Sequence, residues 1–231
     1  MSSALVLALI ALVGSVFSAA VVAWGQWRTS RFEADRDASA VLSKYREPLV
    51  DAAYDLQSRI YNILRLDFFG KYLVDGTAAE RRYAIDNTLY VIAQYFAWTE
   101  ILRRKIQFMN FGRVDRTRRV AERQRAIVQA FQSDDPGLGV AYRVWRGEQR
   151  AIGEQMIVEA QGEAQVLGYS QFATDREHPV WLWLAHLEAS MTLPAPASTA
   201  RLTLLQHALV DLIRELDPEA ARYGRFELER V

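Results

Sequence analysis

The residues of this chain that could do acid–base chemistry are charged side chains inside apolar stretches. Glu100 lies between Trp98 and Ile101. A later stretch with the periodicity of a helix carries Arg150 and Glu154. Two carboxylates that face each other across a helical bundle, with an arginine between them, would have perturbed pKa values, as catalytic groups often do. Glu100, Glu154 and Arg150 are therefore candidate catalytic residues, although structural ion pairs produce the same pattern more often.

A basic block between residues 103 and 125 is the second candidate site. It holds nine basic and two acidic residues, whereas residues 126–231 hold nine basic and fifteen acidic ones. The block could bind anionic lipid, at about 1 kcal/mol per basic residue near the surface. It could instead pair with the acidic C-terminal part, or form a solvated face with pairs such as Arg118 and Glu122. Nucleic-acid binding is disfavoured, since interleaved stacking aromatics are absent. The residues assigned to lipid or partner binding are Arg103, Arg104, Lys105, Arg116, Arg119 and Arg123.

Motifs for metal, nucleophilic and phosphate chemistry are missing from the sequence. No histidine has the Glu-x-x-His spacing of a di-iron site, and a chain without cysteine has no thiolate zinc site. Around Ser170 a nucleophile elbow would need glycine where Phe172 stands. Gly137-Leu138-Gly139 is too short for a phosphate-binding loop. We expect no metal and no cofactor.

The N-terminus is expected to hold these sites at a membrane. Residues 4–24 form a run of 21 residues without charge. As a helix this run spans roughly 31 Å, close to the ~30 Å hydrocarbon core of a bilayer. Trp24 and Trp27 lie where an interfacial aromatic belt would be. A cleaved signal peptide is the alternative, but such a peptide has a basic start and an apolar run of only about 7–15 residues. The sequence predicts a retained transmembrane anchor over residues 1–27.

The asymmetry of lysine and arginine predicts the orientation of the anchor. No Lys or Arg precedes the run, whereas Arg28, Arg31 and Arg36 follow it closely. The N-terminus is therefore expected outside, and the C-terminal domain in the cytoplasm at the plasma (inner) membrane. Small residues recur every three or four positions in the anchor and could support a homodimer. They are Ala4, Ala8, Ala11, Ser15 and Ser18.

Charge and periodicity predict helices after the anchor. Residues 28–47 are expected to form a charged juxtamembrane helix that continues the anchor. Pro48 should end it, because the residue before a proline is pushed out of helical geometry. An α-helical domain over residues 48–231 follows. Its first helix has an apolar stripe made of Leu49, Ala53, Leu56, Ile60 and Ile63.

A capping box of Thr77 and Glu80 predicts the start of the next helix, which can run to Gly112. Residues 89–98 are rich in β-formers, but their 3.6-residue stripe favours helix. Later helices are expected at residues 120–131, 140–160, 179–190 and 202–216, with a Pro/Ala/Ser linker at 193–199. The predicted fold class is all-α: a single N-terminal transmembrane helix followed by a cytosolic α-helical bundle.

Four short phrases resemble an uncharacterised group of bacterial membrane-anchored helical proteins. They are Tyr45-Arg46-Glu47-Pro48-Leu49, Tyr54-Asp55-Leu56-Gln57-Ser58-Arg59, Tyr61-Asn62 and Glu148-Gln149-Arg150-Ala151-Ile152-Gly153-Glu154. The resemblance covers most of the chain after the anchor and implies that this part is one domain. It implies no activity, cofactor or site residue.

Together these features predict a single-pass membrane-anchored interaction or scaffold protein. Its role would be to hold or recruit a partner protein at the inner membrane face. The alternative is a membrane-tethered enzyme that uses carboxylate and arginine groups inside the helical bundle. A domain outside the membrane follows if the orientation is reversed.

Overall fold

The computed structural model describes residues 3–106, 115–160, 162–192 and 196–231. In the first part of the chain, side chains are described at residues 14–15, 18–19 and 21–28, and again from residue 43. The helices are α1 (Ser3–Arg65), η1 (Gly70–Val74), α2 (Ala78–Ile106), α3 (Asp115–Gln132), η2 (Pro136–Leu138), α4 (Arg146–Gln155), α5 (Tyr169–Thr174), α6 (Val180–Met191), α7 (Pro196–Leu216) and η3 (Arg225–Leu228). The two strands are β1 (Ile157–Ala160) and β2 (Glu163–Val166). The helical fold class is confirmed, apart from this hairpin.

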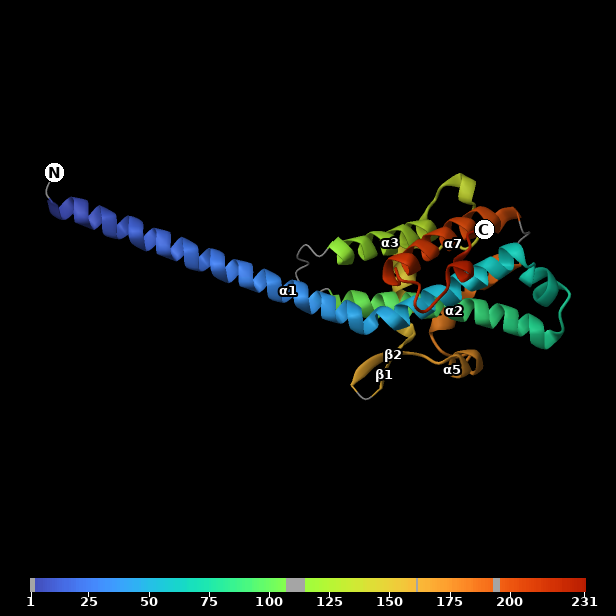
Figure 1. The fold of residues 1–231 in the computed structure, drawn as a ribbon. Helices are drawn as coiled ribbons and strands as arrows, with labels where there is room; N and C mark the ends of the chain where they lie inside the picture. Colours follow the sequence, from blue (N-terminus) through green and yellow to red (C-terminus); the bar gives the residue numbers. More distant parts are fainter. Residues whose placement is uncertain (1–2, 107–114, 161, 193–195) are drawn as a thin grey trace.

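Helix α1 is a single element of 63 residues whose N-terminal half projects from the body of the molecule (Figure 1). It runs through Pro48, so our prediction that this proline ends a helix was wrong. A proline inside a helix costs about 3 kcal/mol because it removes one backbone hydrogen bond and crowds the preceding turn. Tyr45, Leu49 and Val50 are buried on both sides of it. Their packing against the body offsets that cost.

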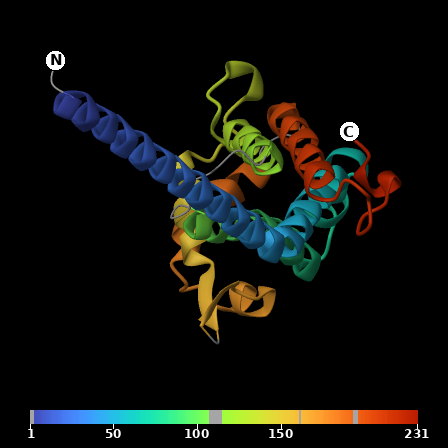
Figure 2. The same cartoon turned by 60° about the vertical axis from the view of Figure 1, so that its left-hand side comes forward.

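The body is a bundle in which the C-terminal half of α1 packs against α2 and α7 (Figures 1 and 2). Helix α3 covers α7, and α4 packs against α2. The predicted stripe of α1 is confirmed from Leu49 to Ile60, and Ile63 is half-buried. In α7 the predicted stripe is fully buried, at Leu202, Leu205, Leu209, Leu212 and Leu216. These two helices supply much of the core.

The predicted capping box at the start of α2 is confirmed. The Thr77 backbone N–H donates to Glu80 Oε2 over 2.8 Å, and the Glu80 N–H donates to Thr77 Oγ1 over 3.3 Å. Residues 89–98 are helical, as their stripe predicted. The expected stop at Gly112 lies outside the described residues.

The helix predicted at residues 140–160 is confirmed only over α4, Arg146–Gln155, and both of its predicted ends were wrong. Tyr142 is buried with a left-handed φ of 57°, and the Val144 N–H donates to the carbonyl of Phe131 over 3.0 Å. The chain therefore crosses the end of α3 in a turn and an extended segment, and α4 begins only at Arg146. After α4, β1 and β2 pair antiparallel around Gly162, whose φ of 77° suits glycine. Contacts with α3 overrode the local helical periodicity.

Helix α7 already begins at Pro196, so residues 196–199 of the predicted linker are helical, and the rest of that linker lies outside the described residues. Within the described part of the chain, no helix has an apolar stretch long enough to cross a membrane. Most side chains of the expected anchor, residues 4–24, lie outside the described residues.

A buried arginine closes the C-terminal end of α3. Arg201 on α7 has no exposed surface. Its Nη1 donates to the carbonyls of Ala130 and Phe131 over 2.6 and 3.0 Å, and its Nη2 donates to those of Ser133 and Gly139 over 2.8 Å each. Carbonyls at the end of a helix lack helical partners and carry a partial negative charge. Arg201 supplies both the donors and the opposite charge.

A substitution in α7 tests the placement of the core. Leu212 is fully buried and Leu204, on the same helix, is 43% exposed. Leu212→Ala should lower the free energy of unfolding by about 2–5 kcal/mol, because it leaves a cavity. Leu204→Ala should change it by less than about 1 kcal/mol. Urea unfolding of the full chain in mild detergent, followed by circular dichroism, measures both; equal losses would contradict the assigned face of α7.

Candidate functional site: an ion-pair cluster and a distal cavity

The candidate carboxylates Glu100 and Glu154 come together in the structure, with Arg104 between them. Arg103 donates from Nε to Glu100 Oε2 over 2.7 Å and from Nη2 to Oε1 over 2.6 Å. Arg104 Nε donates to Glu100 Oε1 over 2.8 Å, and its Nη2 lies 3.4 Å from Glu154 Oε1. The arginine between the carboxylates is thus Arg104 and not the candidate Arg150, which is exposed.

Gly153 on α4 allows the close approach of α4 to α2 that brings Glu154 near Arg104. A Cβ at this position would lie 2.6 Å from the carbonyl oxygen of Phe96 and 3.2 Å from the Cβ of Glu100. The glycine therefore lets α4 approach the backbone of α2 directly beside Glu100. The next residue along α4 is Glu154, which this approach brings within reach of Arg104.

The electrostatics of Glu100 indicate a carboxylate that stays ionised. Burial by itself would raise the pKa of Glu100, but hydrogen bonds from Arg103 and Arg104 outweigh it and hold the pKa below its ordinary value. Only 3% of the side chain is exposed, and both oxygens are occupied by guanidinium groups. A carboxylate held in this way orients Arg103 and Arg104 on its own helix, and Arg104 reaches Glu154 on α4. It does not exchange protons near neutral pH.

The basic block lies partly against acidic residues of α7. Arg119 Nε donates to Glu215 Oε1 over 2.8 Å, and Arg123 Nη1 lies 3.6 Å from Asp211 Oδ2. The remaining members of the block differ in their surroundings. Arg118 lies 3.8 Å from Glu122, as the one-turn spacing predicted, and Lys105 is exposed. The side chain of Arg116 lies outside the described residues. The geometry thus fits pairing between the basic block and the acidic C-terminal part.

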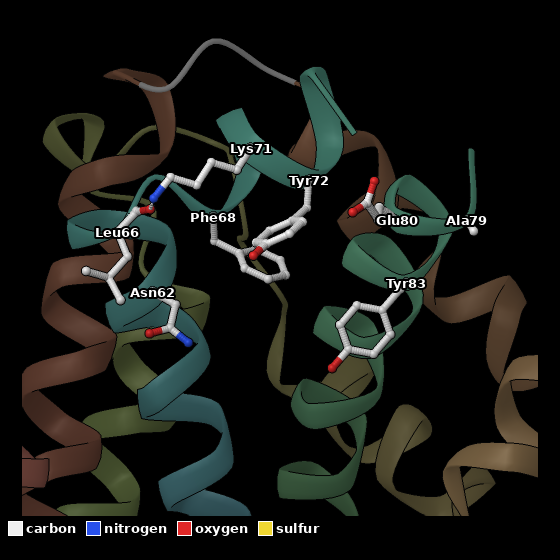
Figure 3. Close-up of a pocket in the computed structure, with 8 residues that line it drawn as sticks. All are labelled: Asn62, Leu66, Phe68, Lys71, Tyr72, Ala79, Glu80 and Tyr83. Atoms are coloured by element: carbon white, nitrogen blue, oxygen red, sulfur yellow. Dashed lines mark hydrogen bonds between the residues drawn. The ribbon is translucent and has the colours of Figure 1, made fainter. Parts of the chain in front are cut away.

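A cavity of about 600 Å³ opens between the side chains drawn in Figure 3. The elements around it lie at the end of the body opposite the projecting half of α1 (Figure 1). The end of α1, η1 and the first turns of α2 enclose the cavity. Its lining residues are Asn62, Leu66, Phe68, Lys71, Tyr72, Ala79, Glu80 and Tyr83. The volume is typical of a small-molecule site. Sequence reasoning missed this site, although the aromatic residues on either side of Gly70, between two predicted helices, were a signal for it.

Arg59 lies directly behind two walls of the cavity. Its guanidinium carbon is 3.9 Å from the ring centre of Phe68 and 5.7 Å from that of Tyr83. Nη2 donates to Asn87 Oδ1 over 2.5 Å. Burial lowers the pKa of Arg59. Arg59 therefore makes cation–π contacts with the faces of both rings and adds positive charge beneath the cavity.

A second buried ion pair lies nearby, between Asp86 of α2 and Arg176, just after α5. The Asp86 side chain is almost fully buried, and the guanidinium carbon of Arg176 lies 3.9 Å from the ring centre of Trp181. The pair attaches the α5–α6 segment to α2. Neither residue was singled out in the sequence.

The chain matches no known family model, no curated protein and no solved structure. These comparisons give no support to the resemblance noted in the sequence.

A pair of isosteric substitutions tests the structural role of the carboxylates. Glu100→Gln should lower the free energy of unfolding by about 1–3 kcal/mol, because it leaves two arginines without their buried partner. Glu154→Gln is the matched control in an exposed pair and should cost less than about 1 kcal/mol. Denaturant unfolding of the full chain in mild detergent measures both.

The pH dependence of the free energy of unfolding provides a second test of the Glu100 ion pair. The pKa of Glu100 is lower in the folded chain than its ordinary value of 4.5. Its stabilising contribution is therefore fully present above pH 4.5 and is lost as the pH falls through the lower folded pKa. The Glu100→Gln chain should lose less stability than the wild type over that acid range. Identical acid profiles would contradict the assigned ion pair.

Proposed function

We propose that this protein is a single-pass membrane-anchored helical interaction or scaffold protein that holds or recruits a partner at the inner membrane face. In this proposal residues 1–27 are the anchor, the N-terminus lies outside, and the helical body lies in the cytoplasm. The observation that carries the proposal is the projecting half of α1. On it, Val21, Val22 and Trp24 are each more than half exposed. A bilayer would cover such an apolar helix, and a tryptophan suits its interface.

The continuity of α1 gives the proposed anchor a rigid connection to the body. From Trp27 to Tyr45, the first buried residue that the structure describes, a helix rises about 27 Å. Charges interact only weakly with a lipid surface beyond the Debye length of ~8 Å at physiological salt. An upright α1 would therefore keep the basic block away from the headgroups. This spacing and the pairs formed by Arg119 and Arg123 favour protein recruitment over lipid docking.

Two further roles stay predictions. A homodimer through the small residues of the anchor is compatible with a projecting helix. The alternative function is a membrane-tethered enzyme, and the position of Arg104 between Glu100 and Glu154 is the observation that favours it. However, the hydrogen bonds that Glu100 accepts from two arginines are more typical of a structural cluster.

The anchor is tested by membrane extraction. The full-length protein should stay in the membrane fraction after an alkaline carbonate wash and should keep residues 1–27 by intact-mass analysis. Addition of arginines at Ser2 and Ser3, with neutralisation of Arg28 and Arg31, should invert or scramble the topology. Protease protection of the C-terminal body in sealed vesicles reports the orientation. A mature chain that starts near Val21, or release of the protein from the membrane by carbonate, would contradict the proposal.

The basic block is tested by vesicle binding. In a chain lacking residues 1–27, the triple change of Arg116, Arg119 and Arg123 to glutamine should lower the free energy of unfolding by about 0.5–2 kcal/mol, since it breaks exposed ion pairs. Binding to anionic vesicles should hardly change. Arg146→Gln, exposed on α4 and outside the basic block, is the control. If the triple change instead abolishes a vesicle binding that weakens towards 0.5 M salt, lipid docking is the function of the block.

A further inference from the structure

The distal cavity has an uneven distribution of charge around an aromatic centre. Figure 3 shows Lys71 and Asn62 on one side of Phe68 and Tyr72, with Glu80 and Tyr83 on the other. The first side belongs to α1 and η1, and the second to the first turns of α2. The cavity therefore has a positive wall and a negative wall, with rings between them.

Each of the two charged side chains has hydrogen-bonding capacity left for a ligand. Lys71 Nζ donates to the carbonyl of Leu66 over 2.8 Å, which uses one of the three N–H groups of an ammonium. The hydrogen bonds between Thr77 and the Glu80 side chain all use Oε2, not Oε1. Those bonds hold the pKa of Glu80 below its ordinary value, so the carboxylate is ionised at neutral pH.

The aromatic rings form the centre of the cavity. Phe68 and Tyr72 have ring centres 5.0 Å apart, inclined at 48°. Tyr72 and Tyr83 are 41% and 48% exposed, which leaves surface of both side chains open to a ligand. Aromatic faces attract cations that carry no hydrogen-bond donors, such as methylated ammonium groups. Positive charge from Lys71 on the opposite side, and from Arg59 behind Phe68 and Tyr83, makes the cavity unsuitable for a cation alone.

The segment that forms one wall has unusual backbone geometry. Asp67 has a left-handed φ of 54°, and residues 70–74 form a π-helix, η1. A Cβ at Gly70 would lie 2.3 Å from the Asp67 carboxylate, so the Asp67 side chain packs closely over this glycine. Strained residues and π-helices occur frequently at functional sites. This geometry places Phe68 and Tyr72 next to each other in the cavity.

We propose that the distal cavity binds a small free zwitterion with a methylated ammonium group at one end and a carboxylate or phosphate at the other. The methylated ammonium lies against Tyr72 and Tyr83, close to the Glu80 carboxylate. The anionic end accepts hydrogen bonds from Lys71 Nζ and the Asn62 amide. The ligand is a free solute and not a lipid headgroup. The elements around the cavity lie at the end of the body farthest from the projecting half of α1, which is the proposed membrane anchor.

Isothermal titration calorimetry of the full-length protein in dodecyl maltoside tests the proposal, with 4-(trimethylammonio)butanoate as the probe. Tetramethylammonium and butanoate represent its two halves. The zwitterion should bind, and each half should bind at least about tenfold more weakly, because it contacts only one wall. No binding of the zwitterion at 10 mM, or equal binding of tetramethylammonium, would overturn the proposal.

Variants separate this site from any other part of the chain. Glu80→Gln keeps a residue that can close the capping box but removes the negative charge. It should weaken binding about fivefold or more, as should Tyr83→Leu and Lys71→Gln. Arg82→Gln, exposed on α2 outside the lining, is the matched control and should leave the affinity unchanged. Retained affinity in both Glu80→Gln and Tyr83→Leu, with circular dichroism showing a folded chain, would disprove the site.

The source of the ligand is tested in the same titration. Phosphatidylcholine added to the micelles presents a methylated ammonium and a phosphate as a lipid headgroup. It should not displace the probe, whereas free phosphocholine should. Displacement by the lipid would identify a headgroup as the ligand and overturn the free-solute proposal.

Discussion

The buried guanidinium of Arg201 is the interaction on which the arrangement of the body depends. A charge without water is stable only when protein groups replace its hydration, and here carbonyls of α3 and of the segment after it do so. Arg201 attaches α3 to α7, and α7 in turn packs on α1. The same hydrogen bonds hold the segment that ends at Gly139 and leads to α4.

The balance of charge in the whole chain has a structural meaning. The formal net charge is zero, but the basic and acidic residues are separated along the sequence. Folding brings the two groups together where α3 lies against α7, at Arg119 with Glu215 and Arg123 with Asp211. Arg104 on α2 does the same with Glu154 on α4, while Glu100 pairs with Arg103 and Arg104 inside α2. The pairs Arg119–Glu215, Arg123–Asp211 and Arg104–Glu154 each join two helices. The candidate catalytic carboxylates therefore have the geometry of structural ion pairs.

Helix α1 connects the two features that bear most directly on function. One end carries the exposed apolar residues of the proposed anchor, and the other end forms a wall of the distal cavity. A helix rises about 1.5 Å per residue, so the separation of the two ends follows from the length of the chain between them. The proposed anchor and the proposed ligand site are thus held apart on one rigid element. Binding at the cavity would take place well away from the bilayer.

The sequence by itself determined the features that depend on neighbours a few residues apart. The stripes of α1 and α7, the capping box at Thr77 and the helical state of residues 89–98 are local, because one turn of helix contains the interacting residues. The tertiary structure decided what depends on distant contacts. It carried α1 through Pro48, shortened the helix predicted at residues 140–160 to α4 with a turn packed on α3 before it, and put Arg104 between Glu100 and Glu154. It also built the distal cavity from the end of α1, η1 and α2. Local propensities of ordinary residues are worth only fractions of a kcal/mol, and a proline in a helix costs about 3 kcal/mol. Burial of one large side chain is worth about 1.5–3 kcal/mol, so the packing of several such side chains outweighs both.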